Sequence, residues 1–264
     1  MKKALLIFAF SIFASSISFS QNLQAYMSYT LFNSPVDGPY IETYLSVYGP
    51  SVEYVKNESG NFQSSVEVTI IFRQGENIVS FDKYEVKSQE YPDTTLAYYE
   101  NFLAQQRYVL GNGKYDMEFI ISDINTSDEP YLTTDPITID FPTDKPSISG
   151  IELLSSYQKA EVAGALTKSG VDLYPYVFNF FPETVESIMF YCELYNTDEA
   201  FGEGEKFIYN YFIESFETNS IIKDFSRTRV GKAAEVLPIM KDFTIRDLPS
   251  GNYLLVVEIR DQEN

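Results

Sequence analysis

The stretch SVEVTIIF, residues 65–72, decides the fold class of this chain. Its apolar residues at positions 66, 68 and 70 alternate with polar residues at 65, 67 and 69. A period of two residues is typical of a strand with one buried face. The same alternation recurs in residues 114–121 and 253–259, and turn sequences such as Gly75-Glu-Asn and Gly111-Asn-Gly separate the strand-like runs. The pattern predicts an all-β protein.

The length predicts two domains. The chain has 264 residues, more than one β-sandwich of about 100 residues needs. A run rich in proline and small polar residues, DFPTDKPSISG at 140–150, reads as a linker. We therefore predict two tandem immunoglobulin/fibronectin-like antiparallel β-sandwich domains, one over residues 22–142 and one over 146–264. The best helix candidate is the segment 96–105. The last four residues resemble the turn of an unfinished hairpin, so we expect a truncated second domain and a longer protein.

Two related motifs indicate that the halves repeat. LGNGKY at 110–115 and LPSGNY at 248–253 are offset by 138 residues, and each precedes alternating apolar residues and an Ile-x-Asp sequence. Two further pairs of segments match in the same order: 42–48 with 189–195, and 66–81 with 207–225. Three ordered matches predict a duplicated module. The spacing also predicts that Tyr115 and Tyr253 form tyrosine corners, in which the phenol ties the start of a strand to a loop.

The first residues predict a secretory signal peptide. Two lysines precede the apolar run ALLIFAFSIF at residues 4–13, and Ser18 and Ser20 follow it. A basic start, an apolar stretch and a small-x-small site make up such a signal. The alternative, a membrane anchor, needs about 20 apolar residues, and serines interrupt that length. We expect a signal at residues 1–20 and a soluble mature protein in the periplasm or outside the cell, without membrane insertion.

The composition excludes several classes of function. Removing residues 1–20 removes two lysines and no acid, so 19 basic and 38 acidic residues become 17 and 38, and the net charge moves from −19 to −21. Nucleic acids and anionic lipids require basic surface, so we expect neither as a partner. The chain has no histidine, which excludes histidine-dependent triads and histidine-bound metals. Its single cysteine, Cys192, lies in an apolar run and is predicted to be a core residue.

Two acidic loops, residues 123–129 and 196–205, offer oxygen atoms to calcium, which takes about six to eight such ligands. Neither loop has the EF-hand spacing, so we expect solvated loops without a specific calcium site. No pair of carboxylates has a spacing that indicates glycoside hydrolysis. Asp93-Thr94-Thr95 resembles a short O-glycosylation acceptor motif of some exported bacterial proteins. We predict no catalytic, cofactor-binding or metal-binding residue.

Several segments resemble the N-terminal part of GWxTD domain-containing proteins. They are QAYMSY at 24–29, FNSP at 32–35, GPYIETYLSV at 38–47, GEGEKF at 202–207, YFIESF at 211–216 and LPSGNY at 248–253. The resemblance covers the mature chain and implies an exported bacterial protein, without implying a particular activity. The Gly-Trp-x-Thr-Asp motif that names the family is absent, because the chain has no tryptophan.

Two functional hypotheses follow from the sequence. The first is a non-catalytic exported structural or protein-binding module with an unknown protein partner in the cell envelope. The second is an accessory N-terminal region of a longer exported enzyme whose catalytic part is missing. A longer reading frame that continues into a catalytic domain would favour the second hypothesis.

The signal peptide yields the first testable prediction. Because Ser18 and Ser20 provide the small residues that signal peptidase requires, we expect cleavage between Ser20 and Gln21. Intact-mass measurement of the exported protein should give a chain that begins at Gln21. An exported protein that retains residues 1–20 would contradict the prediction.

Overall fold

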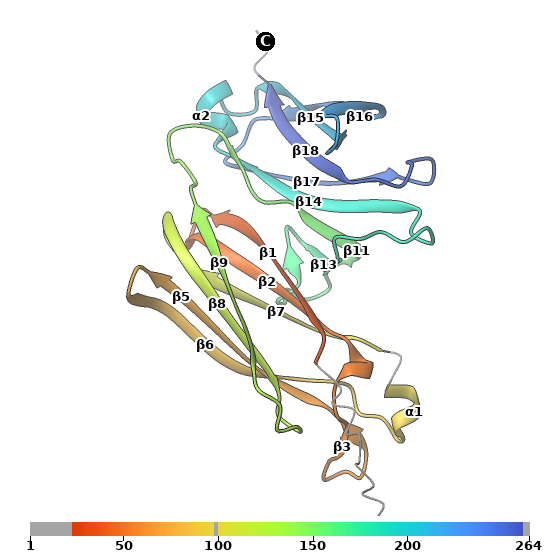
Figure 1. The fold of residues 1–264 in the computed structure, drawn as a ribbon. Coiled ribbons are helices and arrows are strands. Elements are labelled where there is room, and N and C mark those ends of the chain that lie inside the picture. The colour runs from red at the N-terminus through yellow and green to blue at the C-terminus, as the bar shows by residue number, and fades with distance from the viewer. Residues whose placement is uncertain (1–22, 98–99, 261–264) are drawn as a thin grey trace, which may run out of the picture.

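The computed structural model describes residues 23–97 and 100–260 (Figure 1). Its regular structure is nearly all antiparallel β-strand, arranged in several sheets, which confirms the all-β class. The predicted signal peptide, residues 1–20, lies outside the described residues. Among the described residues, no helix has both the length and the apolar character needed to cross a bilayer.

The first half of the chain forms two facing sheets. The three-stranded sheet has the order β1-β2-β7 and the four-stranded sheet the order β6-β5-β8-β9. The strands are β1 (Ala25–Ser34), β2 (Gly38–Val47), β5 (Ser65–Gln74), β6 (Asn77–Lys87), β7 (Phe102–Val109), β8 (Gly113–Asp123) and β9 (Tyr131–Ile139). The shorter elements are η1 (Gly49–Ser51), β3 (Val55–Lys56), β4 (Phe62–Gln63) and α1 (Thr94–Ala97). As the alternation predicts, Val66, Val68 and Ile70 are completely buried and form the core with inward residues of β2 and β8.

The second half has the same general plan. One sheet has the order β10-β14-β11-β13-β12, with β17 also paired to β14, and the other the order β16-β15-β18. The first of these contains β10 (Ser147–Ile148), β11 (Glu152–Lys159), β12 (Thr167–Lys168), β13 (Val171–Pro175), β14 (Ser187–Tyr195) and β17 (Val236–Thr244). The second contains β15 (Lys206–Ser215), β16 (Ser220–Lys232) and β18 (Tyr253–Arg260), and α2 (Thr197–Phe201) follows β14. Aromatic residues such as Phe190, Phe207 and Tyr211 fill the space between the two sheets.

One expected element is wrong. In the segment 96–105, the best helix candidate, the described residues contain only the end of the short helix α1, and β7 begins at Phe102. β7 pairs with β2 along its whole length, from Val47 opposite Phe102 to Tyr40 opposite Val109. Pairing with an existing strand therefore overrides the weak helical preference of this segment.

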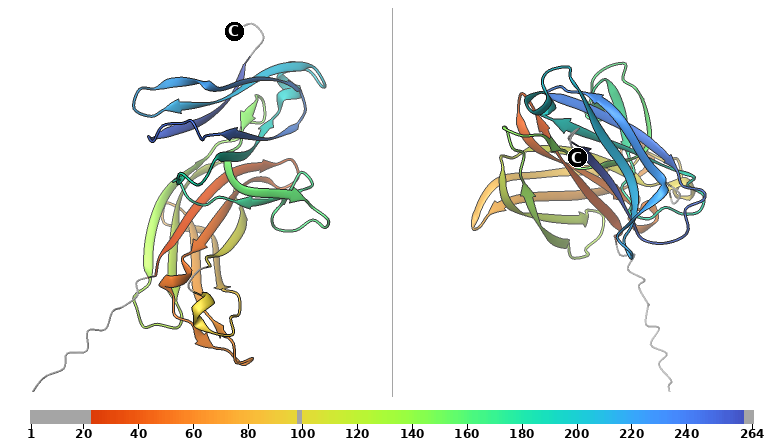
Figure 2. Two further views of the ribbon diagram at one scale, coloured as in Figure 1. Left: turned by 90° about the vertical axis from the view of Figure 1, so that its right-hand side faces the viewer. Right: turned by 90° about the horizontal axis from the view of Figure 1, so that it is seen from above.

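Strand pairing stays within each half of the described chain. The pairs in the sheets join residues 25–139 to one another and residues 147–260 to one another. Figure 2 shows the two halves stacked end to end in an elongated molecule. The segment between them, residues 140–146, corresponds to the predicted linker, and the amide group of Asn196 donates a hydrogen bond to the Pro142 carbonyl oxygen at 2.9 Å.

The repeated motifs occupy corresponding places in the two halves. β8 pairs with β5 and β18 pairs with β15, so that Phe119 lies opposite Ile70 and Val257 lies opposite Tyr211. Phe119 and Val257 are 138 positions apart, which is the offset between the two motifs. The pairing register therefore makes Tyr211 the counterpart of Ile70, and β15 the counterpart of β5.

The predicted tyrosine corners are present in both halves. The hydroxyl of Tyr115 donates to the Gly111 carbonyl oxygen at 2.8 Å, and the hydroxyl of Tyr253 donates to the Pro249 carbonyl oxygen at 2.8 Å. In each case the phenol closes the turn that precedes its own strand. A Cβ atom at Gly251 would lie 3.2 Å from the hydroxyl oxygen of Tyr253, so the ring packs against the space that this glycine leaves open.

A buried cluster of charged side chains joins the two halves. Lys168 of β12 is 5% exposed, and its ammonium group contacts Glu42 of β2 and, at 2.5 Å, Glu152 of β11. Glu42 is completely buried, pairs with Arg107 of β7 and accepts a hydrogen bond from the Tyr44 hydroxyl at 2.6 Å. Burial raises the pKa of Glu152 above its usual value, although Lys168 opposes the shift. The cluster thus contains two cations and two carboxyl groups, contributed by both halves.

A second polar cluster lies beside the first. Both carboxylate oxygens of Glu193 accept phenol hydrogen bonds, from Tyr191 at 2.5 Å and from Tyr195 at 2.6 Å. The Tyr195 hydroxyl also accepts a hydrogen bond from the backbone N–H of Asn33, across the junction, at 2.9 Å. The neighbouring Phe32 is completely buried and packs against Tyr191. These contacts tie β1 of the first half to β14 of the second.

Gly150 permits the backbones of the two halves to approach closely. Its N–H donates to the Leu31 carbonyl oxygen at 2.8 Å. A Cβ atom at this position would lie 2.7 Å from the Thr30 side chain and 3.2 Å from the Leu31 nitrogen. Any larger residue would therefore push β1 away from the segment that follows the linker.

The buried cluster yields a prediction about stability. In Lys168→Met the carboxyl groups of Glu42 and Glu152 remain buried without the cation that lies between them. Removing one partner of a buried ion pair costs roughly 3–5 kcal/mol, so we expect the free energy of unfolding, measured by urea titration, to fall by about that amount. The control, Arg246→Met, removes an exposed pair with Glu186 and should leave the urea midpoint unchanged.

The triple variant Lys168→Met, Glu42→Gln, Glu152→Gln separates charge burial from packing. It removes the buried negative charges together with the cation, and we expect it to be more stable than Lys168→Met alone. An unchanged urea midpoint in Lys168→Met would contradict the expected cost of leaving Glu42 and Glu152 buried without the Lys168 ammonium group.

Candidate functional site

The structure gives the first acidic loop a structural role. Asp123 ends β8, is 7% exposed, and its two carboxylate oxygens accept hydrogen bonds from the backbone N–H groups of Glu53 at 2.7 Å and Asn125 at 2.9 Å. The carboxylate therefore fixes the loop to the segment that follows η1. Among residues 23–97 and 100–260, no group of three acidic, cysteine or histidine side chains has the geometry to hold a metal ion.

The second acidic loop, residues 196–205, contains α2 and is anchored by its first residues. The hydroxyl of Thr197 is buried, donates to the Ala234 carbonyl oxygen at 2.8 Å and accepts from the Ala234 N–H at 2.9 Å. Asn196 adopts the left-handed conformation, with φ of 55°. The polar groups at the start of this loop are thus used to join it to the segment before β17.

Two other features singled out in the sequence are Cys192 and the segment Asp93-Thr94-Thr95. Cys192 is completely buried in the core of the second half, and burial together with Glu193 raises the pKa of its thiol to about 12. A thiol with so high a pKa is a poor nucleophile, in agreement with a core role. In the segment Asp93-Thr94-Thr95, the Asp93 carboxylate accepts a hydrogen bond from the Thr95 N–H at 2.9 Å at the start of α1.

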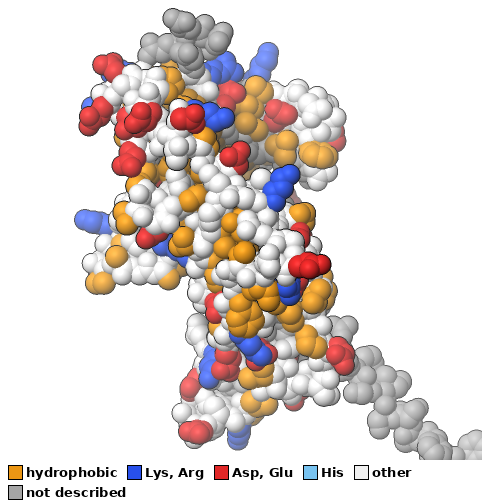
Figure 3. All heavy atoms as spheres, turned by 90° about the vertical axis from the view of Figure 1, so that its left-hand side faces the viewer, with side chains coloured by type: hydrophobic (Ala, Val, Ile, Leu, Met, Phe, Trp, Pro, Cys, Tyr) orange, Lys and Arg blue, Asp and Glu red, His pale blue; other side chains and the backbone are white. Residues whose placement is uncertain are grey.

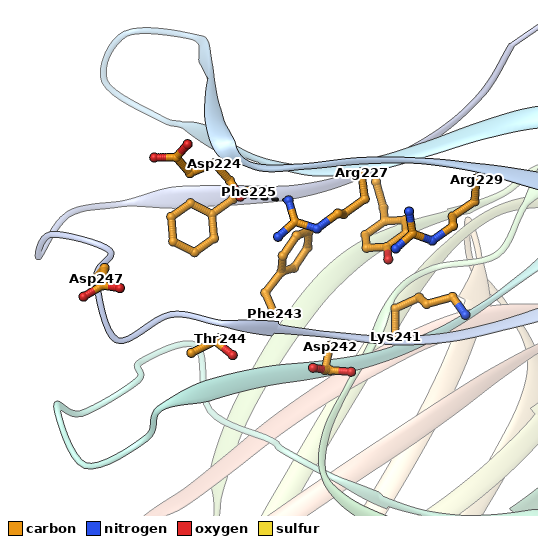
Figure 4. A pocket seen from close by; sticks show the side chains of 10 residues that line it. Asp224, Phe225, Arg227, Arg229, Lys241, Asp242, Phe243, Thr244 and Asp247 are labelled. Atoms are coloured by element: carbon orange, nitrogen blue, oxygen red, sulfur yellow. Dashed lines mark hydrogen bonds between the residues drawn. The ribbon is translucent and has the colours of Figure 1, made fainter.

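The main candidate site is a cleft between β16 and β17, of about 660 Å³. We call it the β16–β17 cleft. Figure 4 shows its side chains projecting from the two strands toward one another. It is lined by Tyr211, Asp224, Phe225, Arg227, Arg229, Lys241, Asp242, Phe243, Thr244 and Asp247.

Aromatic rings form the inner wall of the cleft. The ring centroids of Tyr211 and Phe243 are 5.3 Å apart, and those of Phe225 and Phe243 are 6.2 Å apart. The guanidinium of Arg227 lies 5.7 Å from the Phe243 ring centroid, and that of Arg229 lies 5.7 Å from the Tyr211 ring centroid. Each guanidinium is thus within cation–π distance of an aromatic ring.

The cations of the cleft lack carboxylate partners within the described part of the chain. Arg227, Arg229 and Lys241 take part in none of the ion pairs of these residues. The two arginines donate instead to nearby backbone carbonyl oxygens, at distances of 2.8–2.9 Å. The acidic lining residues Asp224 and Asp247 lie at the other end of the cleft (Figure 4). A third acidic lining residue, Asp242, lies next to Lys241, so the acidic and basic side chains are only partly separated along the cleft (Figure 4).

The corresponding place in the first half carries the opposite charge. Ile70 lies opposite Asp82, and its counterpart Tyr211 lies opposite Arg227. The repeat therefore places an aspartate in β6 where it places an arginine in β16. At the next inward position a neutral residue of β6, Tyr84, corresponds to Arg229 of β16.

The strands β7 and β17, which lie in the opposite sheets of the two halves, also differ at corresponding positions. Ile41 of β2 lies opposite Tyr108 of β7, and Ile188 lies opposite Phe243 of β17. At the offset of 147 residues between the matching runs in β2 and β14, Tyr108 corresponds to Phe243. In the first half the Tyr108 hydroxyl donates to the Asp82 carboxylate at 3.0 Å, and Tyr108 is buried. A tyrosine–aspartate pair thus joins β7 to β6 in the first half. The corresponding place in the second half has Phe243, an arginine and an open cleft.

The sequence reasoning did not identify the cleft. A signal was present: Arg227 and Arg229 are two positions apart, as side chains on one face of a strand are, in a chain with a net charge of −19. That signal does not show which aromatic residues face the arginines, because Phe243 lies in β17, which belongs to the other sheet. On the face shown in Figure 3, acidic, basic and apolar side chains are interspersed, so surface charge alone does not mark a site.

Comparison with known proteins adds no family to this description. No protein-family model matches the chain, and no curated protein matches it.

The structural role of Asp123 yields a prediction about calcium. Asp123→Ala leaves two backbone N–H groups without their acceptor, so we expect the free energy of unfolding to fall by roughly 1–3 kcal/mol. Glu129→Ala, in the exposed part of the same loop, should have little effect on the urea midpoint. At about 150 mM salt, where diffuse attraction is screened, calcium should shift neither midpoint. A calcium-dependent rise in the midpoint of the wild type that Asp123→Ala abolishes would contradict this expectation.

Proposed function

We propose that this chain is a non-catalytic exported module that binds a protein partner in the cell envelope, in the periplasm or outside the cell. The observation that carries the proposal is the β16–β17 cleft, in which Arg227 and Arg229 lie over aromatic rings and form no ion pair within the described chain. Binding sites with few polar groups placed among aromatic side chains are typical of recognition surfaces.

The proposal also includes the domain organisation and the resemblance. We propose that residues 22–142 and 146–264 are two immunoglobulin/fibronectin-like domains, and that the chain is related to the N-terminal part of GWxTD domain-containing proteins. The two-sheet arrangement of each half supports the first statement. The tyrosine corners support it further, because such corners recur in Greek-key sandwiches.

Two features support a role without catalysis. The chain contains no histidine, and its one thiol is completely buried. The ion cluster at Lys168 joins the halves rigidly, as expected of a module that presents a binding surface in a fixed orientation.

Site-specific photocrosslinking tests the binding function. A photoreactive amino acid at Thr244, in the cleft, should join the full-length exported protein to one specific envelope protein in living cells. The same amino acid at Val162, which is 83% exposed and lies in the loop between β11 and β12, serves as the control and should give no such adduct. Failure to capture any protein at Thr244, or capture of the same proteins at both positions, would overturn the proposal.

A further inference from the structure

The β16–β17 cleft lies beside two open strand edges. Among the described residues, β16 pairs only with β15, and β17 pairs only with β14. No described strand pairs with the outer edge of either strand, although the carbonyl oxygens of Asp224, Ser226 and Thr228 in β16 accept hydrogen bonds from Arg227 and Arg229. Such an edge is a template for a further strand, and a peptide bound in this way gains affinity from main-chain hydrogen bonds and specificity from alternate side chains.

The arginines set the chemistry that an added strand would meet. Arg227 and Arg229 are two positions apart, so they project on the same side of β16 with a separation of about 7 Å. A strand that pairs with β16 places its own side chains on that side with the same repeat. Carboxylates at alternate positions would then lie opposite the two guanidinium groups, whose planar N–H edges suit carboxylate oxygens. Opposite charges across a strand pair are stabilising.

The acidic end of the cleft extends the pattern by one more position. Phe225 is the next inward residue of β16, and Asp224 and Asp247 lie beside it (Figure 4). The third inward side chain of an added strand would reach this end, where a basic group is favoured. In the antiparallel direction, the bound peptide reads acidic, any, acidic, any, basic from its N-terminus.

We infer that the β16–β17 cleft binds an extended peptide segment of a partner protein with acidic residues at alternate positions, which pairs as a strand with the edge of β16. The inference rests on the proposed binding function and adds to it the chemistry of the partner. Charge complementarity selects this occupant at the arginine end of the cleft, where Arg227 and Arg229 form no ion pair with a carboxylate of the described residues.

One alternative explains the same arginines without a ligand. Inward-pointing charges on an edge strand prevent association between sheet edges. A purely protective role predicts that no peptide binds and that Arg227→Ser and Arg229→Ser increase aggregation. The experiment below separates the two roles.

Fluorescence anisotropy of a labelled peptide, TETETKT, tests the inference with the full mature chain. We expect saturable binding that weakens as salt is raised, because the charges are partly exposed. Two peptides serve as controls: KTKTETT, in which the charge pattern is reversed, and TEETTKT, which has the same composition but adjacent acids. Each should bind at least tenfold more weakly. Equal binding of TETETKT and TEETTKT would overturn strand pairing, and absence of saturable binding would overturn the inference.

The repeat supplies a variant that closes the cleft. Arg227→Asp with Phe243→Tyr introduces into the second half the aspartate–tyrosine pair that the first half forms between Asp82 and Tyr108. Because the fold already accommodates this pair, we expect the variant to fold and to bind TETETKT at least tenfold more weakly. Lys83→Asp, on the outward face of β6, makes the same change in net charge and should bind within twofold of the wild type.

Hydrogen exchange tests how the peptide binds, and two further measurements test whether another molecule occupies the cleft. Peptide binding should slow hydrogen exchange of the edge amides of residues 226–230. If dextran sulfate binds and the double variant abolishes its binding, while TETETKT does not bind, the occupant is a polyanionic glycan and not a peptide. Concentration-dependent dimerisation that the double variant abolishes, without peptide binding, would replace it by a second copy of the chain. If crosslinking at Thr244 captures a protein but these peptides fail, the inference fails and the proposed function stands.

Discussion

The contact of the Lys168 ammonium group with Glu42 and Glu152 holds the two halves of the molecule in one arrangement. Removing charges from water costs several kcal/mol per ion, and only close pairing recovers that cost. Alternative packings of the halves would leave at least one of these charges buried without a partner. Apolar contacts such as those of Phe32 tolerate small shifts, whereas the ion cluster does not. The cluster therefore contributes orientation more than stability.

The orientation determines what the rest of the molecule presents. The sheet that contains β11, β12 and β13 contacts the first half at the junction through Lys168, which also pairs with Glu152. The three-stranded sheet of the second half then lies away from the first half (Figure 2). The β16–β17 cleft is consequently accessible to another polypeptide, while the aromatic rings at its base belong to the core of the second half.

The two halves have corresponding hairpins that differ at one edge. In each half a tyrosine closes the turn before a strand, Tyr115 before β8 and Tyr253 before β18. That hydrogen bond fixes where the strand begins. They differ where the hairpin faces the other sheet. A Tyr108–Asp82 hydrogen bond spans the gap in the first half, and arginines on aromatic rings occupy it in the second. A few substitutions at inward positions thus change a closed edge into an open one without altering the strand order.

The sequence by itself determined the all-β class, the alternation that buries Val66 and Val68, the tyrosine corners and the core position of Cys192, because each depends on neighbours within a few residues. The tertiary structure decided the rest. Glu42 and Lys168 are 126 positions apart, and no local periodicity relates them. The strand β7 replaced the expected helix at 96–105 because β2 was available to pair with it. The cleft likewise depends on two strands from different sheets, and only the stacking of those sheets brings their side chains together.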